Sequence, residues 1–515
     1  MNGAESLLRS LIASGVDICF ANPGTSEMHF VAALDNVEGM RPVLGLFEGV
    51  VTGAADGYAR MTGKPASTLL HLGPGLANGL ANLHNAKKAQ SPIVNVVGDH
   101  AVSHARYDAP LTSDIVGIAR PVSAWVHSST SSRTVGADAA RAVQASLAAP
   151  GQIATLILPA DTAWEAAEEV APALPKPVPV QVGGATVDRI ARQISASRKT
   201  AILIRGEGLK ERGLRAAGKI ASKTGARIMC DTFAPRIQRG AGRVEVERLP
   251  YFAEQVVEVL AGVELLVLVG AQAPVSFFAY PDKPSWLTPA GAKLAVLSHP
   301  HEDGVVALES LADALGATSA TEKLTARKLP DFPIQGPLDA RSIMQIVARH
   351  LPENAIVADE SLSSGFLHYD VTATAAPHDF LNMTGGAIGS MMAVSTGAGI
   401  ACPDRKVVTL QGDGSAMYIL QALWTQAREN VDVVTVVYAN RGYKILNNEL
   451  KRVGATKEGA LAASMFDLTN PTLDWVALAS GMGVDAVRTE STKGFEAAFS
   501  SAMKTRGPVL IEAVI

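Results

Sequence analysis

Short runs of Val, Ile and Leu recur along this 515-residue chain, and longer, less apolar stretches separate them. Examples are KTAILI from Lys199, ELLVLV from Glu264 and VDVVTVVYA from Val431. Such runs are typical of strands buried on both faces of a parallel sheet, and the stretches between them are long enough to be crossover helices. The pattern therefore predicts an α/β fold of doubly wound parallel sheets.

Two proline-rich segments divide the chain. They are APALPKPVPVQVGG, from Ala171, and KLPDFPIQGPLD, from Lys328. Prolines at this density keep a chain extended and exclude helix, so both segments are interpreted as linkers. The predicted domains are residues 1–170, 181–328 and 338–515, each of ordinary domain size and each with its own strand-like runs.

Charge and cysteine content narrow the possible partners and the compartment. The formal net charge is -4 and no long basic run is present, so neither nucleic acid nor an anionic membrane is expected as a partner. The most apolar stretch, from Val263, is too short to span a membrane. The three cysteines, Cys19, Cys230 and Cys402, are widely spaced, and the N-terminus lacks a signal-peptide pattern. A cytoplasmic location is therefore predicted.

Two glycine-containing motifs at the ends of predicted strands are the most informative. Gly412-Asp413-Gly414-Ser415 ends one apolar run, and Asn440-Arg441-Gly442 ends the next. The spacing from Asp413 to Asn440, 440 − 413 = 27, fits one strand–helix–strand crossover, which returns both loops to one edge of a sheet. Carboxylate, amide and carbonyl oxygens there suit Mg²⁺, and glycine backbone N–H groups suit phosphate. Either motif alone is also compatible with an ordinary turn.

This pair of motifs resembles the fingerprint of thiamine diphosphate-dependent enzymes. The resemblance implies that Asp413, Asn440 and the Gly442 carbonyl bind Mg²⁺. It also implies that the cofactor diphosphate lies against Gly412, Gly414 and Ser415. Three domains follow from it as well: pyrimidine-binding, central and diphosphate-binding.

A second motif, GLFEGVVTGAADGYAR, resembles the same family near the N-terminus. The family has a Glu after its second strand, followed by an Ala-Asp-Gly-Tyr-Ala helix, and Glu48 stands at that position. The resemblance implies that Glu48 shares a proton with the pyrimidine N1′ of the cofactor, a role suited to an acid in a mainly apolar cleft. The alternative is a Glu that only favours a helix N-terminus.

Further cofactor contacts are expected in the C-terminal part. In GGAIG, from Gly385, the resemblance implies that the Gly386 carbonyl binds the pyrimidine amino group and that Ile388 supports the bent cofactor. Ser363 matches a diphosphate contact, whereas Leu362 replaces a residue that is polar in benzoylformate decarboxylase.

Two N-terminal residues resemble the substrate site of benzoylformate decarboxylase. In ANPGTSE, Thr25 stands where that enzyme has a serine that contacts substrate, and His71 in LLHLGPG matches an active-site histidine. Ala279 stands where a second histidine is expected, beside Tyr280. His71, or His100 or His104 in the loop GDHAVSHARYD, is then the candidate proton donor.

These resemblances imply decarboxylation of a 2-oxo acid with thiamine diphosphate and Mg²⁺, in a homodimer or homotetramer whose active site lies between subunits. An acetolactate synthase-like carboligase and a non-catalytic paralogue are the alternatives. The Gly-Glu-Gly at Gly206 is too weak a signal to predict FAD. An NAD enzyme is disfavoured because GPGLANG, from Gly73, is not a dinucleotide fingerprint.

Overall fold

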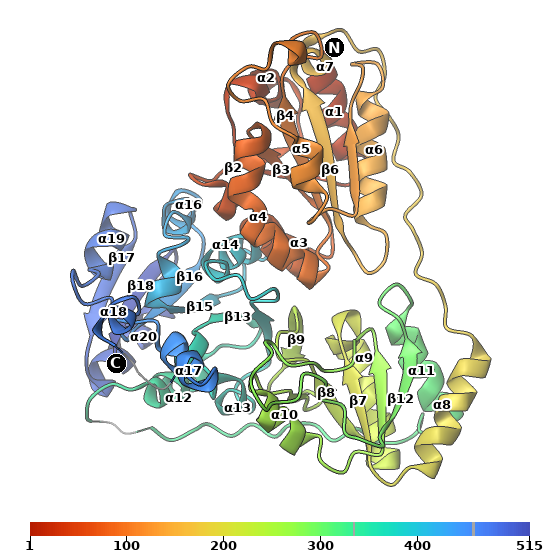
Figure 1. Ribbon diagram of the computed structural model, residues 1–515, viewed down its shortest axis with the longest axis vertical. Helices are drawn as coiled ribbons and strands as arrows, with labels where there is room; N and C mark the ends of the chain where they lie inside the picture. Colours follow the sequence, from red (N-terminus) through yellow and green to blue (C-terminus); the bar gives the residue numbers. More distant parts are fainter. Residues whose placement is uncertain (333–334, 456–458) are drawn as a thin grey trace.

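The computed structural model describes residues 1–332, 335–455 and 459–515. Pro333 of the second predicted linker lies outside the described residues. Three mainly parallel sheets with helices around them form the protein, which confirms the predicted fold class. Figure 1 shows the N-terminal sheet at the top, the C-terminal sheet at lower left and the central sheet at lower right.

The N-terminal sheet is entirely parallel, with strand order β2-β1-β3-β4-β6-β5. Its strands are β1 (Ile18–Asn22), β2 (Arg41–Leu44), β3 (Ala66–Leu70), β4 (Ile93–Asp99), β5 (Trp125–Ser128) and β6 (Ile153–Pro159). Its helices are α1 (Gly3–Ala13), α2 (Met28–Asn36), α3 (Glu48–Thr62), α4 (Leu72–Ala89), α5 (Ile115–Ala119), α6 (Val135–Ser146) and α7 (Ala160–Trp164). A short 3₁₀ helix, η1 (Thr25–Glu27), follows β1.

The central sheet is also parallel, with order β10-β8-β7-β11-β12. Its strands are β7 (Thr200–Ile204), β8 (Arg227–Cys230), β10 (Glu247–Arg248), β11 (Leu265–Val269) and β12 (Lys293–Ser298). Its helices are α8 (Gly184–Ala196), α9 (Glu211–Thr224), α10 (Ala253–Val259) and α11 (Gly304–Ala314). The apolar runs of β7 and β11 are completely buried, as their composition requires.

The C-terminal sheet has order β17-β18-β16-β15-β13-β14-β9. Its strands are β13 (Ala355–Glu360), β14 (His378–Asn382), β15 (Val407–Gly412), β16 (Val433–Ala439), β17 (Asp485–Thr489), β18 (Val509–Val514) and β9 (Arg236–Arg239). Its helices are α12 (Ala340–His350), α13 (His368–Val371), α14 (Met391–Ala401), α15 (Asp413–Ala416), α16 (Ala422–Arg428), α17 (Lys444–Arg452), α18 (Ala460–Ser464), α19 (Trp475–Gly481) and α20 (Thr492–Ala502). The edge strand β9 belongs to the middle of the chain but pairs antiparallel with β14 in the C-terminal sheet. Domain boundaries drawn at the two proline-rich linkers do not predict this pairing.

Close packing of α3 on α14 joins the N-terminal and C-terminal domains (Figure 1). A methyl group on Gly57 would overlap the carbonyl oxygen of Val394, and one on Gly397 would overlap that of Ala54. The two backbones therefore touch, and only glycine permits this approach. Because α3 begins at Glu48, the contact fixes that residue relative to the C-terminal sheet.

Gly57→Ala is expected to lower the thermal transition temperature, because overpacking a tight contact costs about 1–3 kcal/mol. Gly184→Ala is the matched control, since a methyl group on Gly184, at the start of α8, meets nothing within 4 Å. Differential scanning calorimetry of both variants checks the prediction. Equal transition temperatures for the two would contradict the contact.

Candidate active site

Asp413 and Asn440 lie at the carboxyl ends of two paired strands, β15 and β16. The Asp413 carboxylate is buried and accepts hydrogen bonds from the N–H groups of Gly414, at 2.8 Å, and Arg441, at 2.6 Å. Burial raises the pKa of Asp413. A cation placed beside it would offset this desolvation of the charged form. The two loops meet at one edge of the sheet, as their spacing predicted.

The Asn440 amide is oriented by two neighbours. Its Oδ1 accepts from the Gly442 N–H at 3.1 Å, and its Nδ2 donates to the Ser364 hydroxyl at 3.2 Å. No group of three or more His, Cys, Asp or Glu side chains suited to a metal exists among residues 1–332, 335–455 and 459–515. The donor set at this edge, one carboxylate with amide and carbonyl oxygens, nevertheless fits a hard cation such as Mg²⁺.

The first turn of α15, which follows β15 directly, has little space for side chains. A methyl group on Gly414 would overlap the ring of Tyr443, so glycine is required there. The Ser415 hydroxyl donates to the Gly412 carbonyl at 3.0 Å and accepts from the Gln411 amide at 2.7 Å. The Ser415 side chain therefore stabilises the turn, and a contact from this residue to a diphosphate would have to come from its backbone.

The glycine-rich loop before α14 is held by a buried carboxylate that the sequence did not single out. Glu360 accepts from the N–H groups of Gly389, Ser390 and Met391, at 2.5, 2.9 and 2.7 Å. Burial raises the pKa of Glu360, and these three donors oppose that effect. The loop keeps Gly386 at φ +79°, and Ile388 packs partly against the core.

Glu48 is the first residue of α3, and its side chain is buried. The carboxylate accepts a hydrogen bond from the Asn78 amide at 3.0 Å. One turn further along α4, the Asn82 amide donates both to the Gly49 carbonyl, at 2.8 Å, and to the Gly389 carbonyl, at 3.2 Å. The start of the Glu48 helix and the glycine-rich loop are therefore connected within one chain.

His71 pairs with Glu27, a residue whose role the sequence did not reveal. The His71 Nδ1 lies 2.8 Å from the Glu27 carboxylate, which is almost completely buried and also accepts from the Gly24 N–H at 2.8 Å. Gly24 packs directly on the imidazole, and Thr25 is exposed at the start of η1. A carboxylate at Nδ1 favours a proton on that nitrogen, and the second ring nitrogen, Nε2, is then the one that could contact a substrate.

The remaining histidine candidates lie in one loop after β4. His100 Nε2 is buried without a hydrogen-bond partner, and the His100 ring lies 5.5 Å from that of the exposed His104. The loop begins beside Glu27, because a methyl group on Gly98 would overlap the Glu27 carboxylate. His100 is therefore on the same sheet edge as His71.

Aromatic side chains surround the position where Ala279 replaces the expected histidine. Ala279 itself is exposed in the segment between β11 and β12. The ring of Phe277 lies 3.8 Å from the point where a methyl group on Gly386 would stand. It contacts Phe233 and Tyr251, with ring centroids 5.1 and 5.0 Å away. With Phe252 and Phe366, these residues form an aromatic wall beside the glycine-rich loop.

Three residues next to predicted site residues have left-handed backbones although they are not glycine. Leu72 has φ +49°, Leu362 φ +51° and Arg441 φ +56°. They follow His71, precede Ser363 and follow Asn440. Such conformations cost about 1–3 kcal/mol and tend to cluster at functional sites, so their positions support these loops as a site.

No helix in the described part of the chain is both long and apolar enough to cross a membrane.

Comparisons with known proteins agree with the geometry. Residues 1–118 match the thiamine pyrophosphate enzyme N-terminal TPP binding domain, and residues 364–513 match the C-terminal TPP binding domain. A Mycobacterium tuberculosis protein named "Putative acetolactate synthase large subunit IlvX" is 50% identical over 100% of this chain and 99% of its own length. Benzoylformate decarboxylase of Pseudomonas aeruginosa is 29% identical over 97% of this chain and 96% of its own.

A solved structure shares the fold over nearly the whole length. It is the thiamine diphosphate-dependent 4-hydroxybenzoylformate decarboxylase of Rhodococcus jostii RHA1, with a TM-score of 0.87 and 24% identity over 99% of this chain and 98% of its own. Both cofactor-binding domains and the full-length identity agree. The chain therefore belongs to the thiamine pyrophosphate enzyme family, among the enzymes named acetolactate synthase and benzoylformate decarboxylase.

Proposed function

We propose that this enzyme decarboxylates a 2-oxo acid with an aromatic side chain, using thiamine diphosphate and Mg²⁺. The observation that carries the proposal is the aromatic wall beside Gly386, the residue predicted to bind the cofactor pyrimidine. Aromatic rings pack favourably against one another, so such a wall favours an aryl substituent. The names of the Pseudomonas and Rhodococcus relatives, which refer to benzoylformate and 4-hydroxybenzoylformate, support this choice.

Each side chain then has a defined task. Asp413, Asn440 and the Gly442 carbonyl would hold Mg²⁺. Glu48 would hold a proton at the pyrimidine N1′ of the cofactor, and the Gly386 carbonyl would accept a hydrogen bond from its amino group. Thiamine diphosphate, when bound, supplies the nucleophilic carbon and the electron sink for the reaction.

The overall reaction consumes one proton. The bond between C1 and C2 of the 2-oxo acid breaks, C1 leaves as CO₂, and the bonding electron pair remains at C2, where a proton is added to give the aldehyde. His71 is the proposed proton donor: Glu27 pairs with its Nδ1, so the doubly protonated ring gives up the Nε2 proton and returns to the Nδ1–H form.

Carboligation is the second candidate, and Ala279 favours it. The segment between β11 and β12 supplies no histidine to protonate C2. If protonation is slow, C2 instead forms a bond to the carbonyl carbon of a second substrate, whose oxygen takes up the proton, and an acyloin is released.

We propose that two copies of the chain share each active site. Large apolar side chains are exposed around the metal-binding loops: Tyr418 is 55% exposed, Leu461 86% and Met465 74%. Exposed apolar patches of this kind mark protein–protein interfaces. A homodimer or homotetramer in which Glu48 of one copy serves the metal loops of another fits this surface, and the contact through Asn82 within one chain then fixes the start of α3 without completing the site.

A reducing compartment such as the cytoplasm is also proposed. Cys19, Cys230 and Cys402 are free. Burial raises the pKa of Cys19 to about 12 and that of Cys230 to about 11, so both thiols are unreactive.

The test is a panel of 2-oxo acids given to the purified chain with thiamine diphosphate and Mg²⁺. Benzoylformate is expected to release CO₂ and benzaldehyde faster than pyruvate releases CO₂. Acyloin as the main product would favour carboligation instead. Absence of CO₂ from every acid would contradict both candidates and favour a non-catalytic paralogue.

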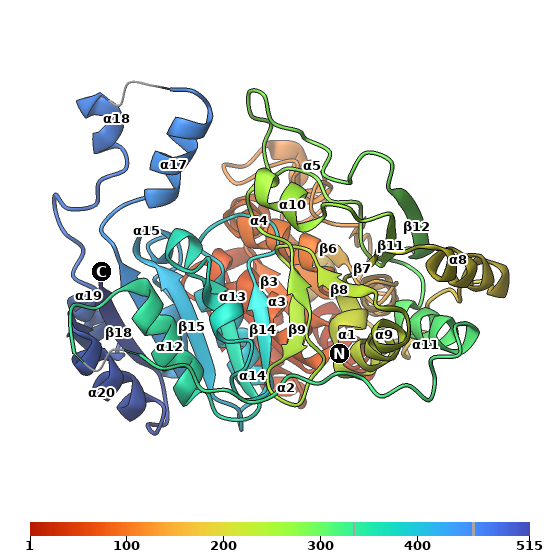
Figure 2. The ribbon, with the colours of Figure 1, turned by 90° about the horizontal axis from the view of Figure 1, so that it is seen from below.

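Helix α17 connects the metal-binding loop to the aromatic wall. Arg452 forms two hydrogen bonds to Glu254 of α10, at 2.6 and 3.0 Å, and its guanidinium lies over the rings of Phe252 and Tyr280, 4.5 and 4.6 Å away. The Tyr280 hydroxyl donates to Glu449 at 2.5 Å. Figure 2 shows α17 on the same side of the molecule as α10. These contacts hold α17 beside the aromatic wall.

Arg452→Gln is expected to raise the KM for aromatic 2-oxo acids about 10-fold with a smaller change in kcat, since a charge-assisted bidentate contact contributes about 1.5–3 kcal/mol. Arg212→Gln is the matched control, because Arg212 makes a similar bidentate pair with Glu309 on the exposed surface. Steady-state kinetics of both variants check this. If Arg452→Gln keeps the KM of the control, α17 does not shape the substrate site.

A further inference from the structure

A second cavity lies away from the site described above, where the central and C-terminal domains meet. Its volume is about 520 Å³, within the range of small-ligand sites. It is bounded by α9, the amino-terminal end of β8, the segment from Arg239 to Glu247, residues 323 and 325, and α13. The predicted active site uses the opposite, carboxyl-terminal ends of strands, so this cavity is separate from it.

Small and apolar residues form much of the cavity wall. They are Gly218, Ala221, Ala226, Ile228, Val244 and Ala373. A wall of this kind accommodates a short aliphatic group rather than a sugar or a nucleotide.

One buried cation in this wall has no anionic partner. Arg239 is 5% exposed, and no carboxylate in the described part of the chain lies within ion-pair distance of it. Its guanidinium donates to the Thr372 hydroxyl at 2.8 Å and to the Tyr369 carbonyl, and it lies 3.7 Å above the Tyr369 ring. Burial lowers the pKa of Arg239. A buried charge without a counter-ion is costly, and the two hydrogen bonds use two of the five N–H donors of the guanidinium.

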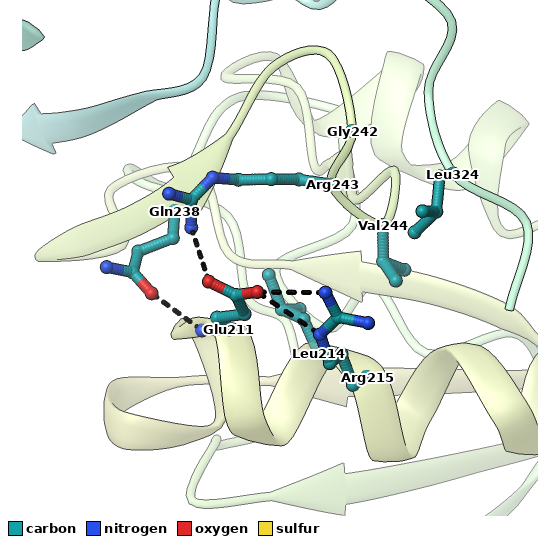
Figure 3. A pocket seen from close by; sticks show the side chains of 8 residues that line it. All are labelled: Glu211, Leu214, Arg215, Gln238, Gly242, Arg243, Val244 and Leu324. Atoms are coloured by element: carbon teal, nitrogen blue, oxygen red, sulfur yellow. Dashed lines mark hydrogen bonds and ion pairs between the residues drawn. The ribbon is translucent and has the colours of Figure 1, made fainter. Parts of the chain in front are cut away.

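Arg215, Arg227 and Arg243 differ from Arg239 in this respect, whereas Arg248, 4.6 Å from the centre of the Tyr369 ring, also has no carboxylate partner among the described residues. Figure 3 shows Glu211 between Arg215 and Arg243, in a separate pocket of about 10 Å³ that shares Val244 with the larger cavity. Arg227, also on the larger cavity, forms two hydrogen bonds with Glu247, at 3.0 and 2.5 Å. The chain therefore supplies carboxylates to these arginines and leaves Arg239 without one.

We propose that this cavity binds a small organic monocarboxylate, with its carboxylate on Arg239 and its aliphatic part on the small apolar residues. The planar guanidinium matches a carboxylate, which accepts two parallel hydrogen bonds from it. Glu245, Glu247 and Asp370 also line the cavity. They disfavour a doubly charged phosphate, although Lys323 is present at the same wall.

The test is isothermal titration calorimetry of the full chain, loaded with thiamine diphosphate and Mg²⁺, with isobutyrate as the probe and isobutyramide as its neutral counterpart. Isobutyrate is expected to bind at one site and isobutyramide not to bind. Arg239→Lys keeps the positive charge but removes the planar guanidinium that can donate two parallel hydrogen bonds to a carboxylate. Ala221→Phe places a large side chain from α9 in the cavity and leaves Arg239 unchanged. Each is expected to weaken isobutyrate binding at least about 10-fold, whereas the exposed Arg212→Gln leaves it unchanged.

Three results would overturn the proposal. They are no binding of isobutyrate to the unmodified chain, unchanged binding in Ala221→Phe, and tighter binding of inorganic phosphate than of isobutyrate. If Arg239→Lys fails to fold, Ala221→Phe decides the matter, because Ala221 is only partly buried. Isobutyrate bound in the active site would be insensitive to Ala221→Phe. The experiment needs no turnover, so its outcome is independent of the proposed decarboxylation.

Discussion

Glu48→Gln is expected to slow hydrogen exchange at C2 of bound thiamine diphosphate by at least about 100-fold, the usual contribution of a positioned acid–base group. Glutamine keeps the shape of the side chain and an oxygen that accepts from Asn78. It cannot share a proton with the pyrimidine N1′ as a carboxyl group does. Cofactor affinity is expected to change little, because the residues proposed to hold the diphosphate and Mg²⁺ lie in a different domain.

The measurement is quenched-flow exchange in deuterium oxide, followed by NMR of the released cofactor, with calorimetry for its affinity. Glu38→Gln is the matched control, because Glu38 is exposed on the same domain. Exchange as fast in Glu48→Gln as in Glu38→Gln would remove Glu48 from the mechanism. A large loss of affinity with unchanged exchange would instead assign Glu48 to cofactor binding.

The sequence predicted the parallel sheets well because their strands carry their own signal. Strands such as β7, β11 and β16 are buried along their whole length and consist mostly of apolar residues, so each is recognisable without knowledge of its neighbours. Strand β9 has the sequence RIQR, with alternating burial, and its partner β14 lies far along the chain. No local sequence pattern indicates such a pairing, so the position of β9 in the C-terminal sheet was not predictable.

The contrast between local signals and contacts of distant segments also separates the site residues that were predicted from those that were missed. Asp413 and Asn440 stand in motifs whose spacing equals one crossover, so the sequence placed them together. Glu27 and Glu360 act on groups that are remote in sequence, namely His71 and the N–H groups before α14. The sequence alone does not distinguish a carboxylate that binds a distant loop from any other acidic residue, because only the folded structure shows the contact.

The metal site allows an equally strong test. Asp413→Ala is expected to weaken Mg²⁺-dependent uptake of thiamine diphosphate at least about 100-fold, because it removes the one charged group among the proposed ligands of a hard cation. The substitution also removes the acceptor of the Gly414 and Arg441 N–H groups, so a loss of binding could arise from a disordered loop.

Asp413→Asn disturbs the loop less than Asp413→Ala, because the amide has nearly the same shape and keeps one of the two oxygens that accept from the Gly414 and Arg441 N–H groups, but it lacks the negative charge. If the charge matters, Asp413→Asn binds the cofactor weakly and recovers part of its affinity at high Mg²⁺ concentration. If only loop order matters, Asp413→Asn binds the cofactor more tightly than Asp413→Ala, and added Mg²⁺ does not change its affinity. The exposed Asp404→Ala is the control, and chelation of Mg²⁺ from the unmodified chain is expected to reproduce the loss. Calorimetry that finds full uptake in Asp413→Ala, or uptake unaffected by chelation, would place the cation elsewhere.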